Sequence, residues 1–189
     1  MTQKSGKQRT AVVCMVYNGY EYLAEFLTYH LALCDDIFLI DHNSERDLRA
    51  LQMDRVTIVR SNHEAQFQSE CTNIVIEHFG IKQKYDWLFV LDIDEFLPFS
   101  SKNTFHDFLN QNKDHYVVQL HWRNGVPFYG EDMTPETLIA CDSIRFFHKD
   151  GKQHKSFVNI AKTKGQFFVP TGAHHISRCL LYTSDAADE

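Results

Sequence analysis

The sequence has few chain-breaking residues, no long hydrophobic run and no excess of positive charge. Only 4 prolines and 8 glycines occur among 189 residues, and no linker-like stretch divides the chain, so we expect a single domain. No segment reaches the roughly 18 consecutive apolar residues that a membrane-spanning helix needs. A net charge of −6 argues against nucleic-acid binding, which requires a basic face. Together with the lack of a secretory signal, these absences predict a cytoplasmic globular domain without a transmembrane segment.

No pair of cysteines has the C-x-x-C spacing. Four of the five lie far apart in apolar surroundings: Cys14, Cys34, Cys71 and Cys141. This pattern is typical of buried thiols in a reducing compartment and not of a zinc site. The fifth begins the segment Cys179–Glu189, which resembles one reading frame of a sequencing-library adapter. We expect residues 179–189 to lie outside the fold and the natural chain to be truncated near Arg178, although an ordinary polar tail is the alternative.

Short apolar runs alternate with amphipathic segments in the first half of the chain. Four runs rich in β-branched and aromatic residues have the length of buried strands, and two segments have apolar residues at helical spacing. The predicted strands are residues 11–17, 37–40, 56–59 and 87–91, and the predicted helices are residues 20–34 and 66–80. This order predicts an α/β fold with a mostly parallel central sheet flanked by helices.

Beyond Pro98 the pattern changes to one short helix and several strand-like runs. The predicted helix is residues 105–109, and the predicted strands are residues 116–120, 143–147, 157–161 and 166–169. With few helices between them, these strands are expected to form a smaller antiparallel or mixed part beside the parallel sheet.

Each of the two long predicted helices carries a stripe of apolar residues. The second stripe consists of Phe67, Cys71, Ile74, Val75, His78 and Phe79. Because His30 lies on the first stripe and His78 on the second, we expect both histidines to be core or boundary residues.

Polar residues follow three of the predicted strands, and ligands of open α/β sheets bind beyond such strand ends. They are Asn18, then Asp41, Asn43 and Ser44, then Asp92 and Asp94. Asp92 and Asp94 are two residues apart, so in an extended chain they point to the same side. Two carboxylates leaving a buried strand together favour a cation between them, and Mg²⁺ or Mn²⁺ with phosphate oxygens suits them. The alternative is a solvated loop, because D-x-D is a common sequence.

Ordered motifs extend this pattern along the chain. They are Val16-Tyr17-Asn18, the segment Tyr22–Leu33, Asp41-x-Asn43-Ser44, Asp86-Trp87-x-Phe-x-Leu-Asp92-x-Asp94-Glu95-Phe96, His121-Trp122-Arg123, Lys155-Ser156 and Gly172-Ala173-His174-His175. In these motifs the sequence resembles GT-A-fold glycosyltransferases, most closely the bacterial family 2 type related to family 92. The resemblance covers nearly all of residues 10–176. One departure is Tyr17-Asn18-Gly19, where the family's first strand usually ends Lys-Asn-Glu, so Asn18 is the only matched residue there.

The resemblance implies a GT-A (Rossmann-like) fold and a division of the chain. A disordered N-terminus, residues 1–9, would precede one glycosyltransferase-like domain, residues 10–178. Residues 10–98 would form its nucleotide-binding half and residues 99–178 its acceptor-side half.

The resemblance also implies a role for each matched residue. The metal, Mn²⁺ or Mg²⁺, would be held by Asp92, Asp94, His174 and His175. The nucleotide would contact Asn18, Asp41, Asn43, Ser44 and Lys155, the last by neutralising the diphosphate. Glu95 would lie near the transferred sugar or against the backbone of the motif. Asp41 could instead cap a turn, Lys155 could be a surface lysine, and either histidine could be a simple strand-end residue.

The implied reaction moves a sugar from a UDP- or GDP-sugar to an acceptor hydroxyl of a glycan or lipid-linked acceptor, in surface glycan synthesis. Peripheral association with a membrane stays open. An inverting mechanism needs a carboxylate base, and the candidates are Glu131 and Asp132, the only adjacent acidic pair between the D-x-D segment and the C-terminal tail. Solvated loop charges are the alternative for this pair.

Two other functions fit parts of the sequence. Phe89-Val90-Leu91-Asp92-Ile93-Asp94 also resembles the nucleophile strand of haloacid-dehalogenase-type phosphatases, in which Asp92 would attack phosphate. That family usually has a small pair after the second Asp, where this chain has Glu95-Phe96. The other alternative is a non-catalytic fragment that binds a nucleotide sugar without turning it over.

Overall fold

The computed structural model describes residues 8–62, 67–121, 124–127, 144–147, 154–173 and 176–178. Of residues 124–127, 144–147, 173 and 177–178 it describes the backbone alone. Residues 1–7 and the adapter-like segment 179–189 lie outside the described residues. Arg9, expected in the disordered N-terminus, is part of the fold, because its N–H donates to Asp86 Oδ2 at 2.7 Å.

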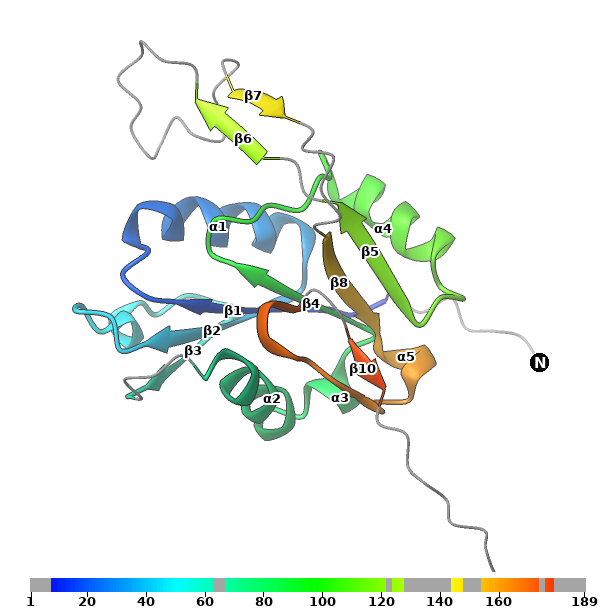
Figure 1. Ribbon diagram of the computed structural model, residues 1–189, viewed down its shortest axis with the longest axis horizontal. Coiled ribbons are helices and arrows are strands. Elements are labelled where there is room, and N and C mark those ends of the chain that lie inside the picture. Colours follow the sequence, from blue (N-terminus) through cyan, green and yellow to red (C-terminus); the bar gives the residue numbers. More distant parts are fainter. Residues whose placement is uncertain are drawn as a thin grey trace, which may run out of the picture.

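A six-stranded sheet forms the centre of the fold, in the order β3-β2-β1-β4-β8-β5 (Figure 1). Its strands are β1 (Thr10–Val16), β2 (Asp36–His42), β3 (Val56–Ser61), β4 (Trp87–Asp92), β5 (Val117–His121) and β8 (His154–Asn159). The first four are parallel to one another, whereas β8 is antiparallel to both β4 and β5. The sheet confirms the mostly parallel α/β architecture predicted from the sequence.

Helices cover both faces of the sheet. Figure 1 shows α1 (Tyr20–Leu33) and α4 (Lys102–Gln111) on one face, and α2 (Gln68–His78) with α3 (Ile81–Lys84) on the other. The strand side chains alternate accordingly: Val12 packs with the α1 and α4 side, and Val13 with the α2 and α3 side. Two apolar cores therefore sandwich β1 and β4, which explains why these strands are almost continuously apolar.

Shorter elements complete the second half. They are η1 (Leu48–Ala50), β6 (Asn124–Pro127), β7 (Ile144–Phe147), α5 (Ile160–Thr163), β9 (Phe167–Phe168), η3 (Thr171–Ala173) and β10 (Ser177–Arg178). β6 pairs with β7, and β9 with β10, both antiparallel. The smaller antiparallel part expected after Pro98 is thus confirmed. Among the described residues, no helix is both long enough and apolar enough to cross a bilayer.

The predicted buried face of α2 is wrong in part, because two of the residues assigned to it face the solvent. Ile74 is 65% exposed and His78 is exposed, so His78 is not a core residue. The buried face instead includes Ser69 and Thr72. Ser69 can be buried because its Oγ donates to the Val169 carbonyl at 2.7 Å. His30, by contrast, is fully buried, as predicted.

Candidate functional site

The ends of β1, β2 and β4 meet at one edge of the sheet. The parallel register pairs Val16 with Asp41 and Met15 with Asp92, so the polar residues that follow these strands are neighbours. The loops after β1 and β2 are joined directly, because the Asn18 N–H donates to Ser44 Oγ at 3.0 Å. The structure therefore brings together the three strand ends at which the sequence places polar residues.

A buried lysine lies among the carboxylates at the end of β4. Lys155 Nζ is 2.7 Å from Asp92 Oδ2 and 3.1 Å from Glu95 Oε2, and the lysine side chain is only 3% exposed. The antiparallel pairing of β8 with β4 explains this position, because Trp87 lies opposite Asn159 and the start of β8 therefore reaches the end of β4. The Lys155 ammonium is thus a buried counter-ion of two carboxylates, which contradicts the surface-lysine alternative.

The predicted strand at residues 157–161 differs from the observed one in a way that matters for this lysine. β8 begins at His154 and ends at Asn159, and α5 begins at Ile160. Asn159 ends the strand by capping the helix, since its side chain accepts a hydrogen bond from the Lys162 N–H. The earlier start places Lys155 inside the strand.

Glu95 closes the turn that follows β4. Its Oε2 accepts from the Asp92 N–H at 2.8 Å, and its own N–H donates to the Asp92 carbonyl at 3.0 Å. Of the two positions expected for Glu95, the one against the backbone of the motif matches this geometry. Glu95 Oε1 is buried without a hydrogen-bond partner in the described structure. Burial raises the pKa of Glu95 to about 7, an effect that Lys155 opposes and Asp92 reinforces.

Asp92 and Asp94 differ in their surroundings. Asp94 is exposed, and no hydrogen bond or ion pair to its carboxylate is found among the described residues. Asp92 is 38% exposed and keeps part of its carboxylate accessible despite the contact with Lys155. Each carboxylate oxygen can accept two partners, so Asp92 retains capacity for another ligand.

This donor set fits a hard divalent cation. Mg²⁺ and Mn²⁺ take one or two carboxylates and complete their coordination with water and substrate phosphates. Within the described ranges, no group of three or more His, Cys, Asp or Glu side chains could hold a metal on its own. His174 and His175 lie outside the described residues, as do Glu131 and Asp132.

A glutamine that the sequence pattern did not single out also contacts Asp92. Gln68, the first residue of α2, donates from Nε2 to Asp92 Oδ1 at 3.1 Å. Its Oε1 accepts from the Gly172 N–H at 3.2 Å. The turn that precedes His174 is therefore tied to the end of β4. No feature of the sequence around Gln68 could have revealed these contacts, which join residues 24 and 104 positions away.

Asp41 is a fully buried carboxylate at the end of β2. Its Oδ1 accepts from the Ser44 N–H at 2.9 Å, and its Oδ2 accepts from Arg60 Nη1 at 2.7 Å and from the Leu48 N–H at 3.3 Å. These contacts match the turn-capping alternative for Asp41. Arg60 lies opposite Asp41 in the β2–β3 register, a pairing that the sequence pattern did not indicate.

The loop after β2 presents Asn43 to solvent. Asn43 is exposed and adopts a left-handed φ of 56°, a conformation that asparagine tolerates better than most residues. Arg60 Nη2 fixes the position of this loop by donating to Asn43 Oδ1 at 3.0 Å and to the Ser44 carbonyl at 2.9 Å. Asn18 supports the same loop, because its Oδ1 accepts from the Glu45 N–H at 2.8 Å. Of the predicted nucleoside contacts, Asn43 is thus the most accessible.

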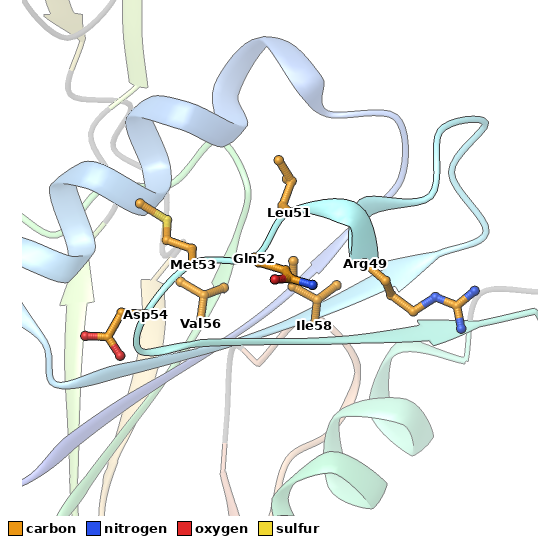
Figure 2. Close-up of a pocket in the computed structure, with 7 residues that line it drawn as sticks. All are labelled: Arg49, Leu51, Gln52, Met53, Asp54, Val56 and Ile58. Carbon is orange, nitrogen blue, oxygen red and sulfur yellow. The ribbon is translucent and has the colours of Figure 1, made fainter.

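A surface groove lies elsewhere, between η1 and β3 (Figure 2). Leu51, Met53, Val56 and Ile58 provide its apolar lining, with the charged Arg49 and Asp54 at its ends. None of the predicted site residues lines this groove, so the strand-end cluster remains the candidate site.

Comparison with known proteins places the chain in a family of glycosyltransferases. The model of glycosyltransferase family 92 matches residues 37–165, which extend from β2 to the end of α5 and include the carboxylate–lysine cluster. The chain belongs to glycosyltransferase family 92. This assignment favours the glycosyltransferase hypothesis over the phosphatase hypothesis for Asp92. A search of curated proteins found no match.

Among solved structures, the chain is similar to the mannosyltransferase PcManGT from Pyrobaculum calidifontis in complex with GDP-Man and Mn²⁺. The two share 16% sequence identity, with a TM-score of 0.48. The match covers 66% of this chain and 37% of that one. This chain therefore spans little more than a third of the length of that mannosyltransferase.

Proposed function

We propose that this chain binds a UDP- or GDP-sugar together with Mn²⁺ or Mg²⁺ and moves the sugar to an acceptor hydroxyl. The observation that carries the proposal is the pair of carboxylates at the end of β4, one exposed and one held by a buried lysine. This pair lies at the edge where β1 and β2 also end, which is where ligands of α/β sheets bind.

In this proposal Asp94 and Asp92 face the cation and the diphosphate. When bound, the cation supplies positive charge that offsets the negative charge developing on the leaving diphosphate. Lys155 contacts one oxygen of Asp92 and one of Glu95, so its positive charge lowers the repulsion between these two neighbouring carboxyl groups. Glu95 fixes the turn by accepting from the Asp92 N–H.

The loop after β2 contacts the nucleoside in this proposal. Asn43 and the backbone of the loop provide the contacts, whereas Asp41, Ser44 and Asn18 hold the loop in shape through the hydrogen bonds described above. A pre-formed loop binds more tightly than a flexible one, because less conformational freedom is lost on binding.

The acceptor side of the proposal rests on residues outside the described ranges. Glu131 or Asp132 is proposed as the base that takes the proton of the acceptor hydroxyl, and His174 or His175 as a further metal ligand. The sugar passes through an oxocarbenium-like transition state, as in glycoside hydrolysis. A glycan or lipid-linked acceptor, a role in surface glycan synthesis and a cytoplasmic location complete the proposal.

Thermal unfolding in the presence of nucleotides tests this function. We expect UDP or GDP to raise the Tm of the wild-type chain only when Mn²⁺ or Mg²⁺ is present, and Asp94→Ala to abolish the shift. Asp107→Ala, which removes an exposed aspartate of α4, is the matched control and should keep the shift.

Two assays of turnover separate the alternatives. Hydrolysis of UDP- or GDP-sugars supports the glycosyltransferase. Hydrolysis of p-nitrophenyl phosphate that Asp92→Asn removes, with no nucleotide effect on Tm, would contradict the proposal and favour the phosphatase. Nucleotide binding without any turnover would instead identify a binding fragment.

A further inference from the structure

Gln68 connects the first aspartate of the D-x-D segment to a distant turn. Its side-chain amide lies between the Asp92 carboxylate and the backbone of η3, with contacts of 3.1 and 3.2 Å. We propose that Gln68 is a positioning residue, which orients Asp92 for cation and diphosphate binding and ties the Thr171–Ala173 turn to that carboxylate. This inference rests on the function proposed above for Asp92 and Asp94.

The chemistry of the two neighbours fixes the orientation of the amide. Both oxygens of Asp92 accept hydrogen bonds, Oδ1 from Gln68 and Oδ2 from Lys155, whereas the Gly172 N–H can only donate one. Gln68 therefore has to direct Nε2 toward Asp92 and Oε1 toward Gly172. A glutamine satisfies both partners at once, whereas an ionised glutamate lacks the donor for Asp92 and a lysine lacks the acceptor for the Gly172 N–H.

Gln68 and Lys155 together immobilise the Asp92 carboxylate. Gln68 contacts Oδ1, and Lys155 contacts Oδ2. With one hydrogen bond on each oxygen, the carboxylate has a defined plane, and each oxygen keeps capacity for one more ligand. Groups that hold a metal ligand in this way typically change metal affinity by about 10- to 100-fold when they are mutated.

Val169, two residues before the turn, is anchored to α2 by a residue that has no hydrogen bond to Asp92. Asn73 donates from Nδ2 to the Val169 carbonyl at 2.7 Å and accepts from the Val169 N–H at 3.1 Å. Ser69 Oγ donates to the same carbonyl at 2.7 Å. The chain therefore offers a matched pair of amides on α2: Asn73 binds the backbone of Val169 and has no hydrogen bond to Asp92, whereas Gln68 binds both the backbone of Gly172 and Asp92.

The experiment measures Mn²⁺ affinity directly. Free Mn²⁺ is followed by electron paramagnetic resonance during titration of the chain in the presence of UDP or GDP, and the Tm shift is recorded over the same Mn²⁺ range. The variants are Gln68→Met, which removes both hydrogen bonds, and Gln68→Glu, which keeps the acceptor for Gly172 but places a negative charge beside Asp92. Asn73→Leu is the control, because it loosens the turn and leaves Asp92 untouched.

We expect the Mn²⁺ concentration at half-saturation to rise about 10- to 100-fold in Gln68→Met and to rise less in Gln68→Glu, because the added negative charge also attracts the cation. It should change less than threefold in Asn73→Leu. Equal effects in Gln68→Met and Asn73→Leu would overturn the inference, because Gln68 would then act only by docking the turn. Unchanged half-saturation in both Gln68 variants would also overturn it while leaving the proposed function intact. Failure of the proposed function is distinguishable, since the wild-type chain itself would then bind no Mn²⁺ with the nucleotide.

Discussion

Replacing Lys155 with methionine removes the counter-ion of two carboxylates while keeping most of the side-chain volume. Lys155 is only 3% exposed and contacts Asp92 at 2.7 Å and Glu95 at 3.1 Å. Removing one partner of a buried ion pair leaves the remaining charge uncompensated, which typically destabilises a protein by about 3–5 kcal/mol. Because Asp92 is 38% exposed and partly solvated, we expect Lys155→Met to lie at the low end, about 3 kcal/mol, at pH 8.5.

The loss in Lys155→Met should depend on pH through Glu95. Its pKa in the folded chain is already raised, to about 7 from 4.5, so stability is lost as the pH rises through the folded pKa. Lys155 opposes this rise, so its removal moves the pKa of Glu95 still higher. At pH 6 Glu95 is then protonated and neutral in the variant, and the loss is smaller. The stability loss at pH 8.5 should exceed the loss at pH 6 by about 1.4 kcal/mol for each unit by which the pKa of Glu95 rises.

Urea unfolding at pH 6 and pH 8.5, followed by tryptophan fluorescence, measures both quantities, since Trp87 is buried on β4. Lys162→Met is the matched control: Lys162 is 41% exposed and contacts the exposed Asp114. Exposed pairs of this kind contribute little. The reasoning is refuted if Lys155→Met destabilises no more than Lys162→Met at pH 8.5, or if its loss is larger at pH 6.

Two further predictions concern buried groups beside the site. Arg60→Met should lower the free energy of unfolding by about 3–5 kcal/mol, because the fully buried Asp41 loses its counter-ion. Adding Asp41→Asn should restore part of this stability. A double-mutant cycle measured by urea unfolding checks the coupling between the two residues. Burial lowers the pKa of His30 to about 4 from 6.5, so the unfolded chain binds more protons below pH 6.5 and stability falls as the pH drops toward 4. Between pH 7 and pH 5 this loss is about 2 kcal/mol. It should be absent in His30→Leu, and equal pH dependence in both proteins would contradict the assignment.

Much of the parallel half could be predicted from local patterns. Buried strands are short apolar runs, and β4 runs directly into Asp92 and Asp94, so the sequence indicates both the strand and the place of the carboxylates. The contacts that define the site are not local. Lys155 and Asp92 are 63 positions apart, and their meeting depends on the pairing of β8 with β4. Sequence periodicity carries no information on which distant strands pair.

Polar residues at buried positions explain the remaining differences. Ser69 and Thr72 lie on the buried face of α2, whereas the apolar Ile74 is exposed. Ser69 is buried there because its hydroxyl donates to the Val169 carbonyl. The sequence pattern did not indicate Arg60 or Gln68 as site residues, since an arginine in a short strand and a glutamine in a helix are common in proteins. Their importance appears only when the carboxylates of Asp41 and Asp92 are placed beside them.

The central claim is that the carboxylates at the end of β4 bind a nucleotide through a divalent cation. Calorimetric titration of the wild-type chain, Asp94→Asn and Asp107→Asn with UDP and GDP, each with and without Mn²⁺, tests it most directly. The account predicts binding of at least one nucleotide by the wild type and Asp107→Asn only when Mn²⁺ is present, and none by Asp94→Asn. Equal nucleotide affinity with and without Mn²⁺, or in Asp94→Asn and the wild type, would contradict it.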